Sequence, residues 1–446
     1  MGNKFPQWLI NLSKLEELRI EGCKRCSELP SLGQLPSLKI LYLIRLDNIR
    51  FIGDEFYGIT ANEEEEGRSR ASGSSTRRQK FFPALEELTV VDIENLAEWK
   101  DADQVRSATG EAEADVFPVL RNFRIRDCPQ LTTIPTQGRF PSLDVLEIKK
   151  NCHVLLAEKV LSNIANLSSL ELSGGHEGIE SLKLVKRPES SLSIDGCNSL
   201  PTDMLERLCL FPTLLRVELR GADNITTLRG QKGLLKSLQE FTVNGCDALT
   251  RLPVEMFESC TSLRVLNLVD CPNLVSFPLD LQRTPSLESF SLFECPNLIA
   301  EMPSGFGYLT SLKKVQIGPF SDVSVIEFDW AGLASSPTLR HVFLWGMPDM
   351  KSLPHQLQCL TTITSLCLIG FEAIEALPDW LGNFAYLEDL ILYYCLKLEY
   401  LPKDAMKRLK LRRLEISYCP LLTERCTPRS GSEWPKISNI TELEID

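Results

Sequence analysis

Residues 263–295 read LRVLNLVDCPNLVSFPLDLQRTPSLESFSLFEC, and this stretch contains one pattern twice. In the first copy, apolar residues stand at Leu263, Leu266 and Leu268, and Cys271 follows them. The second copy repeats the same spacing 24 residues later. Apolar residues that alternate in this way indicate a short strand whose alternate side chains point inward.

The pattern keeps its register along most of the chain. We define the marker of a copy as its first apolar residue, and in the second half the markers are 24 to 27 residues apart: Leu214, Leu238, Leu263, Leu287, Leu312, Leu339, Ile363, Leu387 and Leu411. Earlier copies start at Leu15, Leu38, Leu85, Leu120, Leu143 and Leu167, and a last copy starts at Ile440. With one or two further copies between the markers at 167 and 214, the chain holds about seventeen units.

This period and pattern are those of a leucine-rich repeat, whose units stack to bury a shared core. The sequence therefore predicts an α/β-type solenoid over residues 1–446, a single leucine-rich-repeat horseshoe with a concave parallel β-sheet. Leu-Pro pairs recur in the second half of the units, and proline discourages long helices there. We expect an irregular convex side with short helical turns, for example at residues 378–384.

Two segments interrupt the repeat. Residues 59–80 contain an acidic run followed by a Ser/Gly/Arg run, and residues 100–115 have a similar composition. Because such segments cannot offset their ordering entropy by burial, we expect two disordered loop insertions.

Composition excludes several classes of function. The net charge of −12 disfavours nonspecific binding to nucleic acid. No uninterrupted apolar stretch reaches the roughly 18 residues of a membrane span, and the N-terminus lacks the apolar core of a signal peptide. We therefore expect a soluble, cytoplasmic protein.

The cysteines follow the repeat. Cys23, Cys128, Cys246, Cys271, Cys295, Cys395 and Cys419 each stand eight residues after a marker. We expect them to be reduced and buried inside the turns, where they satisfy backbone groups, which suits a reducing compartment. The pair Cys23 and Cys26 is a lone C-x-x-C motif without the second pair that a zinc site needs. With no nucleotide-binding, kinase or hydrolase motif either, we expect no metal, no cofactor and no enzymatic activity.

Several motifs resemble one family. The run from Phe5 to Lys39 contains Phe-Pro-x-Trp-Leu, the first repeat and Leu-Gly-Gln-Leu-Pro-Ser-Leu-Lys, and residues 52–58 read IGDEFYG. Three further motifs fit the same family. They are the Phe-Pro-x-Leu openings at Phe82 and Phe117, the Cys-Pro-x-Leu motif at four cysteines, and the closing Trp434-Pro-Lys-Ile. Over nearly the whole chain, the sequence resembles the leucine-rich-repeat region of plant intracellular nucleotide-binding (NLR) disease resistance proteins of the coiled-coil class.

The resemblance implies a non-enzymatic module that senses a pathogen effector or a guarded host protein and contributes to autoinhibition. ATP or ADP is expected only in the switch domain of a full-length relative, because this chain has no phosphate-binding loop. Met1 begins inside what resembles a repeat, which suggests a fragment, a truncated gene model or a diverged gene. The alternatives are a substrate-recruiting adaptor of the ubiquitin-ligase type and a generic protein-interaction scaffold.

Two surfaces are candidates for binding. The exposed positions of each strand are the second, fourth and sixth after the marker, and the sixth-position column is mostly apolar or aromatic. With the fourth-position neighbours, the predicted partner-binding stripe consists of Val269, Phe293, Phe343, Trp345, Ile369, Ile391 and Tyr393. The stripe is about 24 Å long, which suits a protein interface with Trp and Tyr as anchors. In the first half, we predict a basic patch that contacts the switch domain of a full-length relative, at Arg121, Arg124, Arg126, Lys149 and Lys150.

Overall fold

The computed structural model describes residues 5–59, 80–100, 115–135, 140–149, 169–173, 190–195, 214–221, 226, 236–252, 257–258, 260–277, 279–298, 303–319, 328–346 and 349–446. The chain divides into two compact units, unit 1 (Met1–Pro201) and unit 2 (Thr202–Asp446).

Each repeat contributes one strand to a parallel sheet. Strand β14 (Val265–Val269) pairs with β15 (Ser289–Phe293), so that Leu266 lies opposite Phe290. Both side chains are fully buried, as are the alternate residues of most other strands. The apolar spacing in the sequence therefore sets which side of every strand faces the core.

Within its described residues, unit 1 has a parallel sheet in the order β1-β2-β5-β8-β9-β10-β11. These strands are β1 (Glu17–Glu21), β2 (Ile40–Ile44), β5 (Glu87–Val91), β8 (Asn122–Arg126), β9 (Val145–Lys149), β10 (Ser169–Ser173) and β11 (Ser190–Asp195). Two small parallel sheets pair β3 (Phe51–Ile52) with β6 (Glu98–Trp99), and β4 (Lys80–Phe81) with β7 (Asp115–Val116). The described residues of unit 1 also form a 3₁₀ helix, η1 (Gln7–Asn11), and one helical turn, α1 (Asp54–Tyr57).

Aromatic side chains fill the core of unit 1. Phe82 stacks on Phe117, and Trp99 meets the ring of Phe56 edge to face. The indole nitrogen of Trp99 donates to the hydroxyl of Tyr57 at 3.0 Å, so the buried polar groups of this cluster are satisfied.

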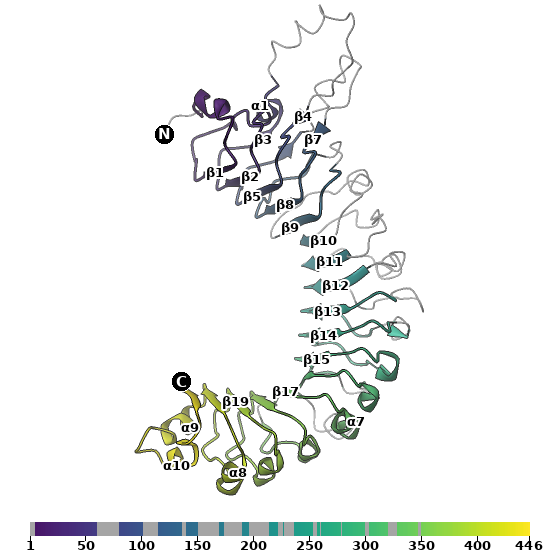
Figure 1. Ribbon diagram of the computed structural model, residues 1–446, viewed down its shortest axis with the longest axis vertical. Coiled ribbons are helices and arrows are strands. Elements are labelled where there is room, and N and C mark those ends of the chain that lie inside the picture. Colours follow the sequence, from purple (N-terminus) through teal and green to yellow (C-terminus); the bar gives the residue numbers. More distant parts are fainter. Residues whose placement is uncertain are drawn as a thin grey trace, which may run out of the picture. The chain divides into compact units, whose positions relative to one another are not determined.

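Unit 2 continues the same design with a parallel sheet in chain order, and short helices lie on the side away from the strands (Figure 1). Its other strands are β12 (Leu214–Arg220), β13 (Glu240–Asn244), β16 (Lys314–Gly318), β17 (His341–Trp345), β18 (Ser365–Ile369), β19 (Asp389–Tyr393), β20 (Arg413–Ser417) and β21 (Glu442–Ile445). The 3₁₀ helices are η4 (Leu281–Arg283), η5 (Phe306–Tyr308), η6 (His355–Cys359) and η7 (Asp379–Asn383), and the α-helical turns are α7 (Trp330–Ser335), α8 (Lys403–Arg408), α9 (Pro420–Arg425) and α10 (Trp434–Ile437).

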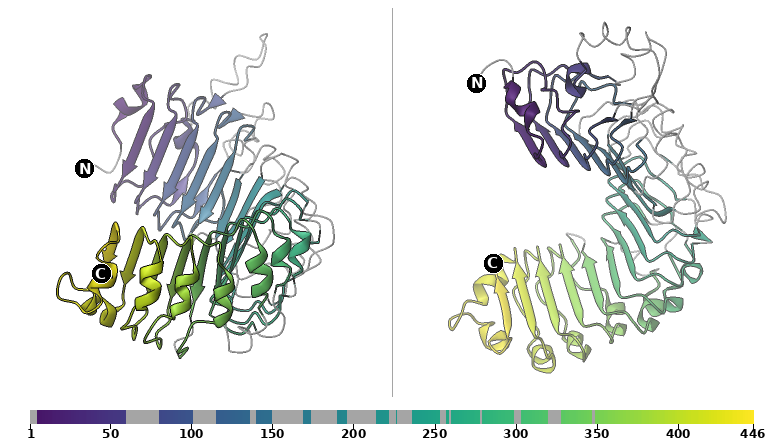
Figure 2. Two further views of the ribbon diagram at one scale, coloured as in Figure 1. Left: turned by 60° about the horizontal axis from the view of Figure 1, so that its bottom comes forward. Right: turned by 45° about the horizontal axis from the view of Figure 1, so that its top comes forward.

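The predicted fold class is confirmed: the chain forms a parallel-sheet solenoid with short helices opposite the strands (Figure 2). The helical turn predicted at residues 378–384 is η7. The helices of the described residues are at most six residues long, which agrees with the proline content of these segments. The single domain of about seventeen repeats stays a prediction, and the two predicted loop insertions lie outside the described residues except at their ends.

The seven cysteines of the repeat are buried as predicted except Cys23, which is half-buried. The thiol of Cys271 donates to the carbonyl of Val269 at 3.4 Å, and the thiol of Cys295 donates to the carbonyl of Phe293 at 3.5 Å. Both cysteines are free and buried. Each thiol thus satisfies the carbonyl of the last strand residue, where the chain leaves the sheet.

The end of unit 2 is held by a buried carboxylate. Glu433, which is 3% exposed, accepts a hydrogen bond from the backbone N–H of Leu401 at 2.8 Å. Lys436 donates to the same carboxylate at 2.6 Å and to the carbonyl of Leu401 at 2.7 Å. Helix α10 is therefore fixed to the chain segment that precedes α8.

Candidate functional site

The predicted stripe lies on the exposed face of the unit 2 sheet. Its seven side chains alternate along their strands with fully buried neighbours, and all seven are half-buried: Val269, Phe293, Phe343, Trp345, Ile369, Ile391 and Tyr393. The side chains thus face away from the core, but they cover one another in part.

The main contact within the stripe joins two strands that are not neighbours. The rings of Phe293 on β15 and Trp345 on β17 stack with 4.8 Å between centroids and an interplanar angle of 5°. The strand between them, β16, has Gly318 opposite Phe293. Gly318 has φ +104°, and a Cβ there would lie 2.2 Å from the carbonyl oxygen of Trp345. The backbone of Trp345 and the positive φ therefore require glycine here, and β16 places no side chain at this position between the two strands.

The indole of Trp345 also contains an unsatisfied donor. Its Nε1 atom is buried and has no hydrogen-bond partner within the described residues. Burying such a group without a partner costs about 1–3 kcal/mol.

On β17, β18 and β19, the fourth positions of the strands are apolar. Phe343 on β17 lies opposite Cys367 on β18, and Cys367 lies opposite Ile391 on β19. Burial raises the pKa of the Cys367 thiol to about 12, so this cysteine is protonated at neutral pH. At the other end, the ammonium of Lys314 lies 4.7 Å from the ring centroid of Phe343, which is a cation–π contact.

Three tyrosines cluster where β19 and β20 end. The rings of Tyr394 and Tyr418 stack with 4.6 Å between centroids, and Tyr393 meets both of them edge to face. Tyr394 is 44% exposed and Tyr418 is 55% exposed. Burial raises the pKa of the Tyr393 phenol, and the neighbouring phenols of Tyr418 and Tyr394 raise it further. We call Tyr393, Tyr394 and Tyr418 the tyrosine cluster.

The sequence analysis missed Tyr394 and Tyr418 because they stand at the seventh position after the marker. Both have φ 53°, in the left-handed region, which turns the chain as it leaves the strand. In other repeats the seventh position holds Asp270 and Glu294, with φ 51° and 56°. A signal was present, because two adjacent repeats carry tyrosine where most other repeats carry glycine or an acidic residue.

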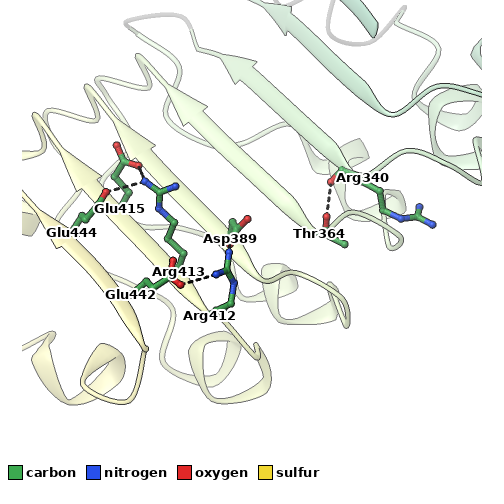
Figure 3. A network of polar contacts seen from close by, with 8 residues as sticks. All are labelled: Arg340, Thr364, Asp389, Arg412, Arg413, Glu415, Glu442 and Glu444. Atoms are coloured by element: carbon green, nitrogen blue, oxygen red, sulfur yellow. Dashed lines mark hydrogen bonds and ion pairs between the residues drawn. The ribbon is translucent and has the colours of Figure 1, made fainter. Parts of the chain in front are cut away.

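Charged side chains border the stripe on the last strands (Figure 3). Arg413 lies 2.9 Å from both Glu415 and Glu444, and Arg412 lies 2.6 Å from Glu442. Arg412 also lies 3.4 Å from Asp389 on β19. Two arginines thus meet four carboxylates on the face formed by β19, β20 and β21.

The predicted basic patch of unit 1 surrounds a buried carboxylate. Glu147 on β9, whose side chain is only 5% exposed, lies 2.5 Å from Arg126, 3.5 Å from Arg124 and 3.9 Å from Lys149. Arg124 also lies 4.0 Å from Glu87. The patch is therefore less positive than its sequence suggests.

Of the two residues predicted to flank this patch, the structure describes one. Arg121 is exposed at the start of β8. Lys150 lies outside the described residues.

Neither a metal site nor a membrane helix is found in the described part of the chain. No group of three His, Cys, Asp or Glu side chains there is arranged to hold a metal ion. No helix of those segments has both the length and the apolar character to cross a membrane.

Sequence comparison finds similarity to plant disease resistance proteins. Residues 1–46 match the family model described as R13L1/DRL21 LRRs. The disease resistance RPP13-like protein 1 of Arabidopsis thaliana is 29% identical over 248 residues, which are 48% of this chain and 21% of that protein. The disease resistance protein RPP4 of the same plant is 26% identical over 240 residues, covering 51% of this chain and 19% of that protein. The chain thus spans about a fifth of the length of these relatives.

Structural comparison agrees on the fold. A leucine-rich-repeat protein of Leptospira interrogans has a TM-score of 0.51 and 18% sequence identity, and the match covers 99% of both chains. Together with the repeat sequence, these likenesses confirm the predicted resemblance: the chain is a leucine-rich-repeat solenoid similar to the repeat region of plant NLR disease resistance proteins.

Proposed function

We propose that the chain is a protein-recognition module of an intracellular plant immune receptor. In this proposal, the exposed sheet face of unit 2 binds a pathogen effector or a guarded host protein in the cytoplasm. The single observation that carries the proposal is the row of aromatic and apolar side chains that runs from the Phe293–Trp345 stack through Ile369 to the tyrosine cluster.

Physical arguments support recognition by this surface. Aromatic residues on the outward positions of a sheet are not required by the core, and exposed aromatic surface marks interaction sites. Tyr and Trp supply large, rigid contact areas with little entropy to lose, which is why they dominate binding hot spots. The half-buried state of the stripe favours binding too, because its side chains are already held in place by their mutual contacts.

The basic patch of unit 1 has a separate role in the proposal. Arg124, Arg126 and Lys149 surround one buried carboxylate, so positive charge remains at the surface. We propose that this patch contacts the nucleotide-binding switch domain in a full-length relative and contributes to autoinhibition. ATP or ADP would bind to that domain and not to this chain, which acts by binding alone and not as an enzyme.

The test uses a full-length receptor that carries these repeats. Tyr418→Ala removes a 55% exposed ring of the tyrosine cluster, and Tyr308→Ala is the matched control because Tyr308 is 59% exposed on η5, on the helical side. We expect Tyr418→Ala to weaken recognition by about thirtyfold, as for a hot-spot aromatic, while both variants accumulate normally. The readout is the defence response of leaf tissue to graded amounts of the recognised protein. An unchanged response in Tyr418→Ala and Tyr394→Ala would contradict the proposal.

The stripe residues themselves give a less direct test. Trp345 stands at an outward position of its strand, but the indole is half-buried and stacked on Phe293. Its truncation therefore removes packing as well as a binding group, so the exposed tyrosines separate recognition from stability better.

A further inference from the structure

We infer that the sheet face of unit 2 binds a partner segment with apolar side chains at one end and lysine or arginine side chains at the other. The inference rests on the proposed function, because it states the chemistry of the partner that the same surface would recognise. It follows from the order of apolar and charged side chains along β16 to β21.

The fourth and sixth positions in the middle of this face are uncharged. On β17, β18 and β19, the fourth and sixth positions hold Phe343, Trp345, Cys367, Ile369, Ile391 and Tyr393. These three strands span two inter-strand intervals, or about 10 Å. This width suits the apolar side of a partner segment.

The C-terminal end of the face is acidic. The outward side chains on β20 and β21 include Glu415 and Glu444, which share Arg413, and Asp446 follows β21 beside the hydroxyl of Ser417 at 3.5 Å. Glu442 and Asp389 share Arg412. Two arginines therefore face five carboxylates, and the surplus negative charge attracts a basic partner.

The tyrosine cluster adds to the preference for a cation. Tyr394 and Tyr418 present exposed rings where β19 and β20 end, and Ser417, the residue before Tyr418, contacts Asp446. The face of a tyrosine ring attracts an ammonium or guanidinium group by about 0.5–1 kcal/mol at an exposed site. A lysine or arginine there would contact both a ring and a carboxylate.

The opposite end of the face sets the orientation. Lys314 on β16 lies over Phe343 and places a positive charge at the N-terminal border of the apolar region. A basic side chain is repelled at this end and attracted at β20 and β21. The partner segment is therefore oriented with its basic end over the last two strands.

The distance across the face gives the length of the segment. Strands β17 to β21 are separated by four intervals, or about 19 Å. A helix needs about 13 residues to cross this distance, and an extended segment needs about 6. A single short segment of a partner protein is long enough to contact both ends.

The test selects a random peptide library, with peptides of about 16 residues, on the full 446-residue chain. Peptides that also bind the variant with Trp345→Ala and Ile391→Ala are removed, so that only ligands of this face remain. We expect the remaining peptides to combine aromatic or aliphatic residues with lysine or arginine at one end. Their affinity is then measured by fluorescence anisotropy.

Charge reversal tests the acidic end directly. In the double variant Glu444→Lys and Asp446→Lys, both positions are exposed, and we expect the selected peptides to bind about tenfold more weakly. The control reverses the same number of charges with Asp379→Lys and Asp404→Lys, which are exposed on η7 and α8, and should leave the affinity unchanged. Circular dichroism checks that all variants are folded.

The possible outcomes separate the two proposals. Selected peptides that are acidic or uncharged, or that bind the double variant as tightly as the parent chain, would overturn the inference and leave the proposed function standing. A selection that yields no peptide dependent on Trp345 and Ile391 would overturn both. Equal losses in the double variant and in its control would show nonspecific attraction to an acidic protein and would also overturn the inference.

Discussion

The indole of Trp345 stacks on the ring of Phe293 across Gly318, although two inter-strand intervals separate their strands. Aromatic pairs of this kind contribute about 0.5–1.5 kcal/mol beyond the area that they bury. We expect Phe293→Leu and Trp345→Leu to show a coupling energy of this size in a double-mutant cycle, measured by denaturant unfolding. If the free-energy losses of the two single variants add up to that of the double variant within about 0.3 kcal/mol, the result would contradict a contact between these rings.

Glu147 should stabilise unit 1 because it is the buried counter-charge of three cations. We expect Glu147→Gln to lower the free energy of unfolding by about 1–2 kcal/mol, a loss reduced by the partial exposure of Arg124, Arg126 and Lys149. Added salt should shrink this loss, because it screens the repulsion among the cations. Glu87→Gln, at a carboxylate that is 35% exposed, should cost less. Equal losses for the two variants would contradict the buried role of Glu147.

Thiol labelling should distinguish the cysteines by position. Cys359 on η6 is exposed, whereas Cys271, Cys295 and Cys367 are buried. Because the thiolate is the reactive form and must reach the reagent, we expect rapid native labelling of Cys359 and labelling of the other three only after unfolding. Mass spectrometry of peptides after labelling for different times measures the order. Rapid native modification of Cys271 would contradict its place inside the turn.

The buried thiol of Cys367 should make stability fall at alkaline pH. Its pKa is about 12 in the folded chain against 9.0 for a free thiol, so above pH 9 the unfolded state releases the proton first. The contribution of this thiol to the free energy of unfolding is fully present below pH 9. It is lost as the pH rises towards 12, by at most about 1.4 kcal/mol per pH unit. We expect Cys367→Ala to flatten the decrease in unfolding free energy over this range, and Cys359→Ala to leave it unchanged. If the unfolding free energies of Cys367→Ala and of the parent chain decreased in parallel with pH, this thiol would ionise as freely in the folded chain as in the unfolded chain.

Glu433 should hold the end of unit 2. Glu433→Ala leaves the N–H of Leu401 and the ammonium of Lys436 without their carboxylate, and we expect a loss of about 2–3 kcal/mol. Asp404→Ala, at a side chain that is 77% exposed, should change stability by less than about 0.5 kcal/mol. Hydrogen exchange at Leu401 measures the local effect, and unchanged protection there would refute the role of the hydrogen bond.

The core of the fold could be predicted because the repeat encodes it directly. The spacing of Leu266, Leu268 and Phe290 determines which side chains face inward, and all three are fully buried. The tyrosine cluster could not be found in the same way, since the direction of Tyr394 and Tyr418 depends on a left-handed residue after the strand. The burial of Glu147 depends on cations that are brought close by strand register and that stand up to 23 residues away in sequence. Strand register and the depth of a side chain arise when repeats stack, so the sequence of a single repeat does not predict them.

The alternation of buried and outward side chains in β14, β17 and β19 has a consequence for how such a surface can evolve. In β14, β17 and β19 the outward residues can be exchanged without altering a core leucine, so each repeat can acquire a new specificity while the scaffold keeps its stability. Phe293 and Trp345 are coupled to each other, because their rings are in contact across an intervening repeat. Mutations at these two sites are therefore epistatic, and a lineage that retargets this part of the surface has to change both residues together.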